Sequence, residues 1–278
     1  MKLLILYNNR SGHNKYYKKL DYIKEKLSTK YELIDLINGN EYLLDSLKNN
    51  NYDTLLIIGG DGTINKSVNI IASLNIKIRL AFIPNGTCND LSRSYGYKKL
   101  NKSLEIILNN NIVTRDLYKI NDNYFLYGFS IGGITEIANN ENRKLFGKLS
   151  YYLHGFVNIF KKPNNSFYHI TYKSNNLNDN YYQIILANTK YLAGFKTKNK
   201  YGNLNLAIFK KRKRFNGFSK FLNYVLFNRR NKKDIFDTVD KITIESEKLL
   251  EATIDGEKFE SSKFEIETIK DYLEIISE

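Results

Sequence analysis

The chain has 278 residues, enough for two domains of common size, and its 42% hydrophobic and 26% charged residues are typical of a globular protein. A single cysteine excludes an internal disulfide, and the three histidines have no metal-ligand spacing. The formal net charge of +14 favours an anionic partner, such as a membrane surface, a polyphosphate or a nucleic acid. No apolar run approaches the length of a membrane span.

The first 117 residues alternate short apolar runs with helical patterns. Strands are expected at residues 2–8, 31–37, 54–58 and 78–84, and helices at residues 15–27, 41–47 and 64–74. A continuous apolar run such as Leu55-Leu56-Ile57-Ile58 is typical of a parallel strand covered on both faces. The alternation predicts a doubly wound α/β domain, in which ligands bind at the carboxyl ends of the strands.

From about residue 118 the pattern changes to short strands separated by asparagine or glycine turns. These strands are expected at residues 117–120, 124–130, 167–172, 182–187, 204–209, 241–246 and 249–254, with a helical insertion at about 149–160. We therefore expect an α/β domain at residues 1–117 and an antiparallel β-sandwich at residues 118–267, with the option that the tail at about 268–278 returns to the first domain. The active site is expected in the interdomain cleft.

The strand at residues 54–58 ends in Gly59-Gly60-Asp61-Gly62-Thr63, and a helical pattern follows. Backbone without side chains approaches phosphates closely, and a helix N-terminus attracts anions. The loop is neither a Walker A loop, because the Gly-Lys ending is absent, nor Gly-x-Gly-x-x-Gly, because Asn65 holds the third place. The carboxylate of Asp61 would repel bound phosphates unless a cation or an acceptor proton lay between them. Its presence therefore indicates a Mg²⁺ ion or an oriented attacking hydroxyl. The alternative is a glycine-rich turn in which Asp61 caps the helix.

Two other strand ends carry similar small polar loops. The fourth strand is followed by Asn85-Gly86-Thr87-Cys88-Asn89-Asp90, and the first strand by Asn8-Asn9-Arg10-Ser11-Gly12. Three such loops at the ends of neighbouring strands indicate one nucleotide site. An alternative role for Asn89 or Asp90 is to cap the next helix. Cys88 is interpreted as a small packing residue rather than a nucleophile.

A further candidate, Ile254-Asp255-Gly256-Glu257, lies between two strand patterns near the end of the chain. From this tetrapeptide alone, a two-residue hairpin turn of Asp-Gly type is the favoured interpretation. The functional alternative is that Glu257 faces the cleft as a general base and takes a proton from an acceptor hydroxyl.

Together these motifs resemble the diacylglycerol kinase catalytic family, which includes soluble bacterial lipid kinases and the sphingosine kinases. The resemblance is carried by residues 8–12, 59–65, 83–90 and 255–257, which occur in the family's order. It implies an N-terminal ATP-binding domain and a C-terminal β-sandwich that binds the lipid substrate. It also implies transfer of the γ-phosphate of ATP, with Mg²⁺, to a lipid hydroxyl, and we expect diacylglycerol as the acceptor and phosphatidic acid as the product.

The resemblance also implies individual roles. Glu257 and Asp61 would be the catalytic residues, with Glu257 as the proton acceptor and Asp61 near a Mg²⁺ held through the phosphates. The residues expected around ATP are Asn8, Arg10, Ser11, Gly12, Gly59, Gly60, Asp61, Gly62, Thr63, Asn65, Gly86 and Thr87. The residues expected to bind the acceptor are Asn89, Asp90 and Arg93.

Two positions depart from the family pattern. Asn9 stands where the family's first loop usually has a proline, which loosens the turn without removing phosphate donors. Soluble bacterial diacylglycerol kinases also resemble one another in an Asp-Asp-Gly loop that holds a structural Mg²⁺, and this chain has Lys200-Tyr201-Gly202-Asn203 there. Tyr201 in place of an acid argues against that metal and against assignment to that subgroup.

A basic aromatic segment begins at Lys210 and ends at Lys233, with ten basic residues and no acidic one. Such a segment can lie in a membrane interface, where each cation near anionic headgroups contributes about 1 kcal/mol. The alternative is a solvated basic face whose aromatic side chains belong to the core. We expect a cytoplasmic enzyme that is peripherally associated with the inner face of the membrane. The sequence leaves the oligomeric state open, with a homodimer as one option.

Two other functions are weighed. An NAD kinase or phosphofructokinase relative would share a similar Gly-Gly-Asp-Gly loop, but the loop at residues 85–90 and the basic aromatic segment favour lipid. A nucleic-acid-binding module would use the positive charge, but no recognisable nucleic-acid motif accompanies it, and we expect no nucleic-acid partner.

Overall fold

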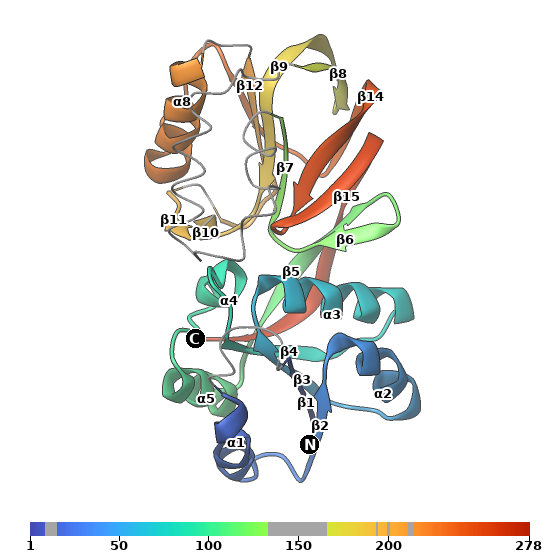
Figure 1. Cartoon of the computed structure of the whole chain (residues 1–278), viewed down its shortest axis with the longest axis vertical. Helices are drawn as coiled ribbons and strands as arrows, with labels where there is room; N and C mark the ends of the chain where they lie inside the picture. Colours follow the sequence, from blue (N-terminus) through green and yellow to red (C-terminus); the bar gives the residue numbers. More distant parts are fainter. Residues whose placement is uncertain (9–15, 133–165, 193, 199–200, 211–213) are drawn as a thin grey trace. The chain divides into compact units, whose positions relative to one another are not determined.

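The computed structural model describes residues 1–8, 16–132, 166–192, 194–198, 201–210 and 214–278. The chain divides into two compact units, one made of Met1–Leu117 with Ile269–Glu278 and the other of Tyr118–Thr268. The expected mixed α/β fold with a large amount of sheet is confirmed (Figure 1). The helical insertion expected at about 149–160 lies outside the described residues.

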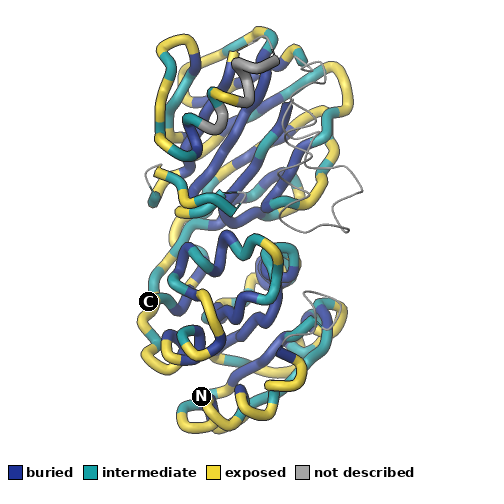
Figure 2. Tube along the Cα trace, turned by 60° about the vertical axis from the view of Figure 1, so that its left-hand side comes forward, coloured by how far each residue is buried: buried dark blue, intermediate teal, exposed yellow. Residues whose placement is uncertain are grey.

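The first unit is built on a parallel sheet in the order β4-β3-β1-β2, and the end of β15 pairs in parallel with β4. Its strands are β1 (Lys2–Tyr7), β2 (Leu33–Asn38), β3 (Thr54–Gly59), β4 (Arg79–Pro84) and the end of β15 (Glu257–Ser277). Every residue of β3 is buried, as its unbroken apolar run predicts, whereas β2 at the sheet edge is partly exposed (Figure 2).

Helices flank this sheet. They are η2 (Tyr17–Lys19), α1 (Leu20–Leu27), η3 (Asn40–Tyr42), α2 (Leu43–Asn49), α3 (Asp61–Leu74), α4 (Asp90–Ser94) and α5 (Leu100–Asn109). α1 lies beside α5, and α2 lies beside α3, on opposite faces of the sheet (Figure 1). α3 buries Ile64, Val68 and Ile71, whose spacings of three and four put them on one face.

Two helix boundaries differ from the prediction. α3 begins at Asp61 rather than at residue 64, because Gly60 is its N-cap and the Gly60 carbonyl already accepts the N–H groups of Thr63 and Ile64. Regular α1 begins only at Leu20, after a short 3₁₀ turn at Tyr17–Lys19. The spacing of apolar residues identifies the buried face of a helix, but it does not locate the first turn, which is partly exposed.

The second unit is made of antiparallel strands. They are the end of β5 (Asn111–Ile120), β6 (Asn123–Phe125), β7 (Gly128–Gly132), β8 (Ser166–Tyr172), β9 (Asn175–Ala187), β10 (Tyr191–Leu192), β11 (Phe195–Lys196), β12 (Asn205–Lys210), β13 (Ile235–Thr238), β14 (Lys241–Ile254) and the first part of β15. The helix α8 (Arg214–Phe227) follows β12. β9 pairs with both β8 and β7, and β14 pairs with the same two strands. The four strands β7, β8, β9 and β14 therefore form a closed hydrogen-bonded circuit, while β10 and β11 pair in a separate two-stranded sheet.

Several strand boundaries are also corrected. The strand expected at 124–130 is two strands, β6 and β7, because the backbone N–H groups between them bind a side chain instead of a neighbouring strand. The strands expected at 241–246 and 249–254 form one strand, β14, with a register irregularity between Glu245 and Leu250. β9 begins at Asn175 rather than at residue 182, since its polar first half is paired with β8. Pairing with a neighbour outweighs local composition in these segments.

Candidate functional site

The strand order of the first unit creates a topological switch point. The chain leaves β1 for β2 on one side and then returns to β3 on the other side of β1. Open α/β sheets bind ligands outside the carboxyl ends of the strands at such a point. Asn8 follows β1 there and Gly60 follows β3. The predicted residues Arg10, Ser11 and Gly12 lie outside the described residues.

The loops after β3 and β4 touch backbone to backbone. A Cβ atom added to Gly60 would lie 2.9 Å from the Gly86 Cα atom, and one added to Gly86 would lie 2.6 Å from the Gly60 Cα atom. The Asn85 N–H also donates to the Gly59 carbonyl oxygen at 2.9 Å. Glycine is therefore required at both positions for the loops to approach this closely.

We expect Gly86→Ala to force these two loops apart, because the nearest atom to the new methyl group is backbone. Overpacking of this kind costs about 1–3 kcal/mol of stability. Thermal unfolding of purified protein measures the loss. Gly128→Ala is the matched control, since its added Cβ atom would meet only the Leu192 side chain at 3.7 Å. Equal stability of Gly86→Ala and Gly128→Ala would contradict the contact.

Asp61 joins the same two loops through its carboxylate. Its Oδ2 accepts the Asp90 N–H at 3.1 Å, and its Oδ1 accepts the Leu91 N–H at 3.0 Å. Burial raises the pKa of Asp61, while the backbone N–H donors act in the opposite direction. Asp61 therefore caps α4, whereas the alternative considered from the sequence had it capping α3, whose N-cap is Gly60.

The side chain of Asn89 closes the loop after β4. Its Oδ1 accepts the Gly86 N–H at 2.8 Å, and its Nδ2 donates to the Gly86 carbonyl oxygen at 2.7 Å. Asn89 is the N-cap residue of α4 by position, but its φ of 54° is left-handed and its side chain makes no capping bond to the helix. The side-chain cap considered for Asn89 is therefore wrong. In the same segment Thr87 is exposed, Arg93 is partly exposed and Asp90 is buried.

Asn40, after β2, is a residue that the sequence analysis missed. Its Nδ2 donates to Ser67 Oγ at 2.8 Å and to the Thr63 carbonyl oxygen at 3.3 Å, both in α3. The preceding Gly39 has a φ of 105°, and its N–H donates to the Tyr7 carbonyl oxygen at 2.9 Å. The sequence contains a signal for this residue, because Gly39-Asn40 is a small polar loop that follows a predicted strand, as the loops at residues 8–12, 59–63 and 85–90 do.

In the second unit, Asp255 and Gly256 form the turn between β14 and β15. Their φ values are 48° and 88°, and Ile254 pairs with Glu257 across the turn. Positive φ at both central residues is what a type I′ hairpin turn requires. The hairpin interpretation of this tetrapeptide is confirmed, and it leaves Glu257 exposed as the first residue of β15.

The Asp255 carboxylate is buried and accepts three backbone N–H groups. Its Oδ2 accepts from Leu126 at 2.7 Å, and its Oδ1 accepts from Tyr127 and Gly128, both at 3.0 Å. The Asp255 N–H in turn donates to the Gly128 carbonyl oxygen at 2.8 Å. This set of bonds holds the hairpin, and Glu257 with it, against the segment between β6 and β7.

Comparison with known proteins finds a match to one family over part of the chain. Residues 2–120 match the diacylglycerol kinase catalytic domain. The resemblance predicted from the motifs is thereby confirmed, and the matched range contains both glycine loops, Asp61 and Asn89. Because this is a kinase family, its members use ATP.

Individual proteins extend the likeness along the chain. A "putative lipid kinase" from Staphylococcus carnosus is 26% identical over 98% of this chain and 95% of its own length. A crystal structure of a "putative diacylglycerol kinase" from Bacillus anthracis has a TM-score of 0.84 at 25% identity, covering 100% of this chain and 95% of that one. An NAD kinase from Archaeoglobus fulgidus, solved with ATP, has a TM-score of 0.57 at 12% identity over 100% of this chain and 94% of that one, and so shares the fold alone.

Two further observations concern metals and membranes. Among the described residues there is no group of three or more His, Cys, Asp and Glu side chains that could hold a metal ion. Within the same part of the chain, no helix is both long enough and apolar enough to cross a bilayer.

Proposed function

We propose that this protein is an ATP-dependent lipid kinase that transfers the γ-phosphate of ATP to a lipid hydroxyl, with diacylglycerol as the first acceptor to test. The observation that carries the proposal is the backbone contact between Gly60 and Gly86 at the carboxyl ends of adjacent parallel strands, where α3 begins. Bare backbone and a helix N-terminus are suited to phosphates. The family match and the names of the relatives support the lipid acceptor.

In this proposal the loops of the first unit bind ATP. The glycines at 59, 60, 62 and 86 let the phosphates approach the backbone, and Asn8, Thr63, Asn65 and Thr87 supply polar groups at the same strand ends. Asp61 has a positioning role, because its two carboxylate oxygens already hold Asp90 and Leu91. A Mg²⁺ ion would therefore be held mainly by the phosphates, and it would offset their charge.

Glu257 is the proposed general base. It takes the proton of the lipid hydroxyl as the hydroxyl oxygen bonds to the γ-phosphorus, the bond from that phosphorus to the β–γ bridging oxygen breaks, and ADP leaves with the bridging electrons. The family resemblance of Asp255-Gly256-Glu257 supports this role, and so does the exposure of Glu257 on a hairpin that is firmly held. Asn89, Asp90 and Arg93 remain proposed acceptor-side residues.

The acceptor is tested with purified protein, Mg²⁺ and γ-labelled ATP. The panel contains diacylglycerol, other lipid alcohols, NAD and a reaction without acceptor. We expect label to move to a lipid, with diacylglycerol as the best substrate. Label on NAD and on no lipid would favour the NAD kinase alternative and contradict the proposal, as would label transfer to water alone.

We also propose that the segment from Lys210 to Lys233 meets an anionic membrane surface. Tyr224 and Val225 on α8 are buried, and the Tyr224 ring stacks on Phe236, so part of its aromatic content belongs to the core. Phe227 at the helix end is 54% exposed. The basic tip, defined as Arg229, Arg230, Lys232 and Lys233, is exposed directly after it. An exposed aromatic ring beside four cations suits a headgroup region.

Replacing all four residues of the basic tip by Gln should weaken binding to vesicles that contain phosphatidylglycerol. At about 1 kcal/mol for each cation, the loss should reach at least tenfold at low salt. The control replaces Lys18, Lys19, Lys98 and Lys99, four exposed lysines of the first unit, by Gln. Cosedimentation measures both, and equal binding by the two variants would contradict the role of the tip.

A further inference from the structure

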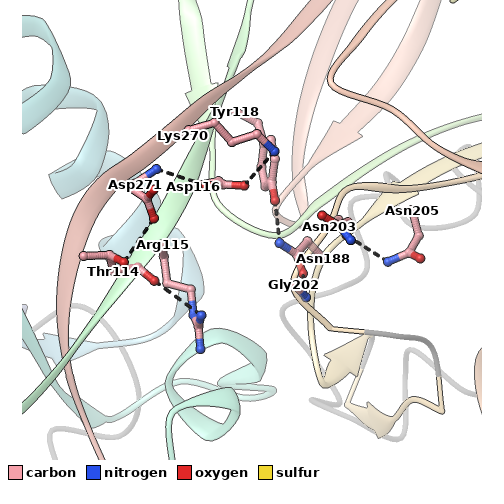
Figure 3. A network of polar contacts seen from close by, with 10 residues as sticks. All are labelled: Thr114, Arg115, Asp116, Tyr118, Asn188, Gly202, Asn203, Asn205, Lys270 and Asp271. Carbon is pink, nitrogen blue, oxygen red and sulfur yellow. Dashed lines mark hydrogen bonds and ion pairs between the residues drawn. The ribbon is translucent and has the colours of Figure 1, made fainter. Parts of the chain in front are cut away.

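The turn at residues 201–205 is attached to the end of β9 by a buried amide. Asn188 Oδ1 accepts the Gly202 N–H at 2.9 Å, and its Nδ2 donates to the Tyr118 hydroxyl oxygen (Figure 3). The Asn188 N–H donates to the Tyr127 carbonyl oxygen at 2.9 Å, and only 9% of the residue is exposed. Asn188 thus ties the turn to two other segments of the second unit with neutral groups alone.

A second buried amide holds the other end of the turn. Asn205 Nδ2 donates to the Asn203 carbonyl oxygen at 2.9 Å and to the Ala187 carbonyl oxygen at 3.2 Å. Gly202 between these anchors has a φ of +123°, which a residue with a side chain rarely adopts. The path of the turn is therefore set by two asparagines and a glycine.

A cation lies beside the same turn. The Lys190 ammonium nitrogen is 5.0 Å from the centroid of the Tyr201 ring. This distance is within the range of a cation–π contact. Lys190 follows Asn188 by two residues and Tyr201 precedes Gly202, so this contact and the Asn188 bond join the same two segments.

This arrangement does not fit the structural Mg²⁺ that the family resemblance implies for the loop. Mg²⁺ in proteins is bound through carboxylates and water, and residues 180–233 contain no Asp or Glu. The polar side chains that hold the turn are amides whose oxygen or nitrogen atoms are already bonded to protein. The ammonium group of Lys190 would also repel a divalent ion at this place.

We propose that Asn188, Lys190, Tyr201 and Gly202 form a metal-independent clasp, which holds the turn after β9 without a divalent ion. The Lys190 ammonium over Tyr201 supplies a fixed positive charge, and the Asn188 amide supplies the bond to the backbone. The clasp stabilises the second unit, so it can be tested without catalysis.

The test is thermal unfolding of the full chain without nucleotide, in EDTA and in millimolar Mg²⁺. We expect the same midpoint in both solutions. Lys190→Met and Tyr201→Leu should each lower the midpoint by about 2 °C, and the double variant should fall no further, because both remove one contact. Tyr201→Phe is the matched control, since it keeps the ring and should keep the midpoint.

Three results would overturn the clasp. A Mg²⁺-dependent rise in the midpoint of the unsubstituted protein would mean that a metal site is present. Additive losses in the double variant would mean that Lys190 and Tyr201 act separately. Unchanged midpoints in both single variants would mean that the contact contributes nothing.

Discussion

Glu257→Gln should lower the rate of phosphoryl transfer by about 10²–10⁴-fold, the range expected when a general base is removed. Gln has nearly the same shape as Glu but cannot accept the proton of the acceptor hydroxyl. Because residue 257 is exposed at the start of β15, the substitution should leave the thermal midpoint unchanged. ATP binding should also persist, since the proposed phosphate-binding groups all belong to the first unit.

The matched control for this substitution is Glu260→Gln, on the same strand. Glu260 is exposed and pairs with Lys258 at 2.7 Å, and a surface ion pair of this kind contributes little to stability. Initial rates with saturating ATP and diacylglycerol in detergent micelles compare the two variants. A Glu257→Gln rate within a few-fold of the Glu260→Gln rate would remove Glu257 from the mechanism.

Asp255→Ala should have the largest effect on folding of the second unit. The substitution leaves the N–H groups of Leu126, Tyr127 and Gly128 without their acceptor in a buried place. At about 1–3 kcal/mol for each unsatisfied buried group, the loss is of the order of 3 kcal/mol or more. Urea unfolding should show it as a lower midpoint with a similar slope.

One further variant separates charge from hydrogen bonding at residue 255, and another serves as the control. Asp255→Asn keeps one acceptor oxygen and should fall between Asp255→Ala and the unsubstituted protein. Asp122→Ala replaces an exposed aspartate in the turn between β5 and β6, and it should be close to neutral. An Asp255→Ala midpoint equal to that of Asp122→Ala would contradict the anchoring role.

Local patterns predicted the parts of the fold that depend on local chemistry. The unbroken run Leu55-Leu56-Ile57-Ile58 indicated a strand buried on both faces, and β3 is such a strand. The Asp-Gly pair at 255–256 indicated a two-residue hairpin because both residues tolerate positive φ, and the turn has that form. Glycine and asparagine at strand ends likewise marked the loops where the backbones of Gly60 and Gly86 meet.

Long-range partners could not be predicted in this way. The bonds from Asp61 to Asp90 and Leu91 span 29 and 30 residues, and those from Asp255 to residues 126–128 span between 127 and 129. A carboxylate in a turn predicts that it will accept hydrogen bonds, but the identity of the donors depends on tertiary packing. The polar start of β9 was missed for the same reason, since its strand form depends on pairing with β8.

The proposal that the strand ends of the first unit bind the triphosphate is tested most directly by a crystal structure with Mg²⁺ and a non-hydrolysable ATP analogue. We predict phosphate oxygens within hydrogen-bonding distance of the backbone N–H groups of Gly60, Gly62 and Thr87. A fully occupied analogue whose phosphates bind elsewhere, with these N–H groups facing only solvent, would contradict the account.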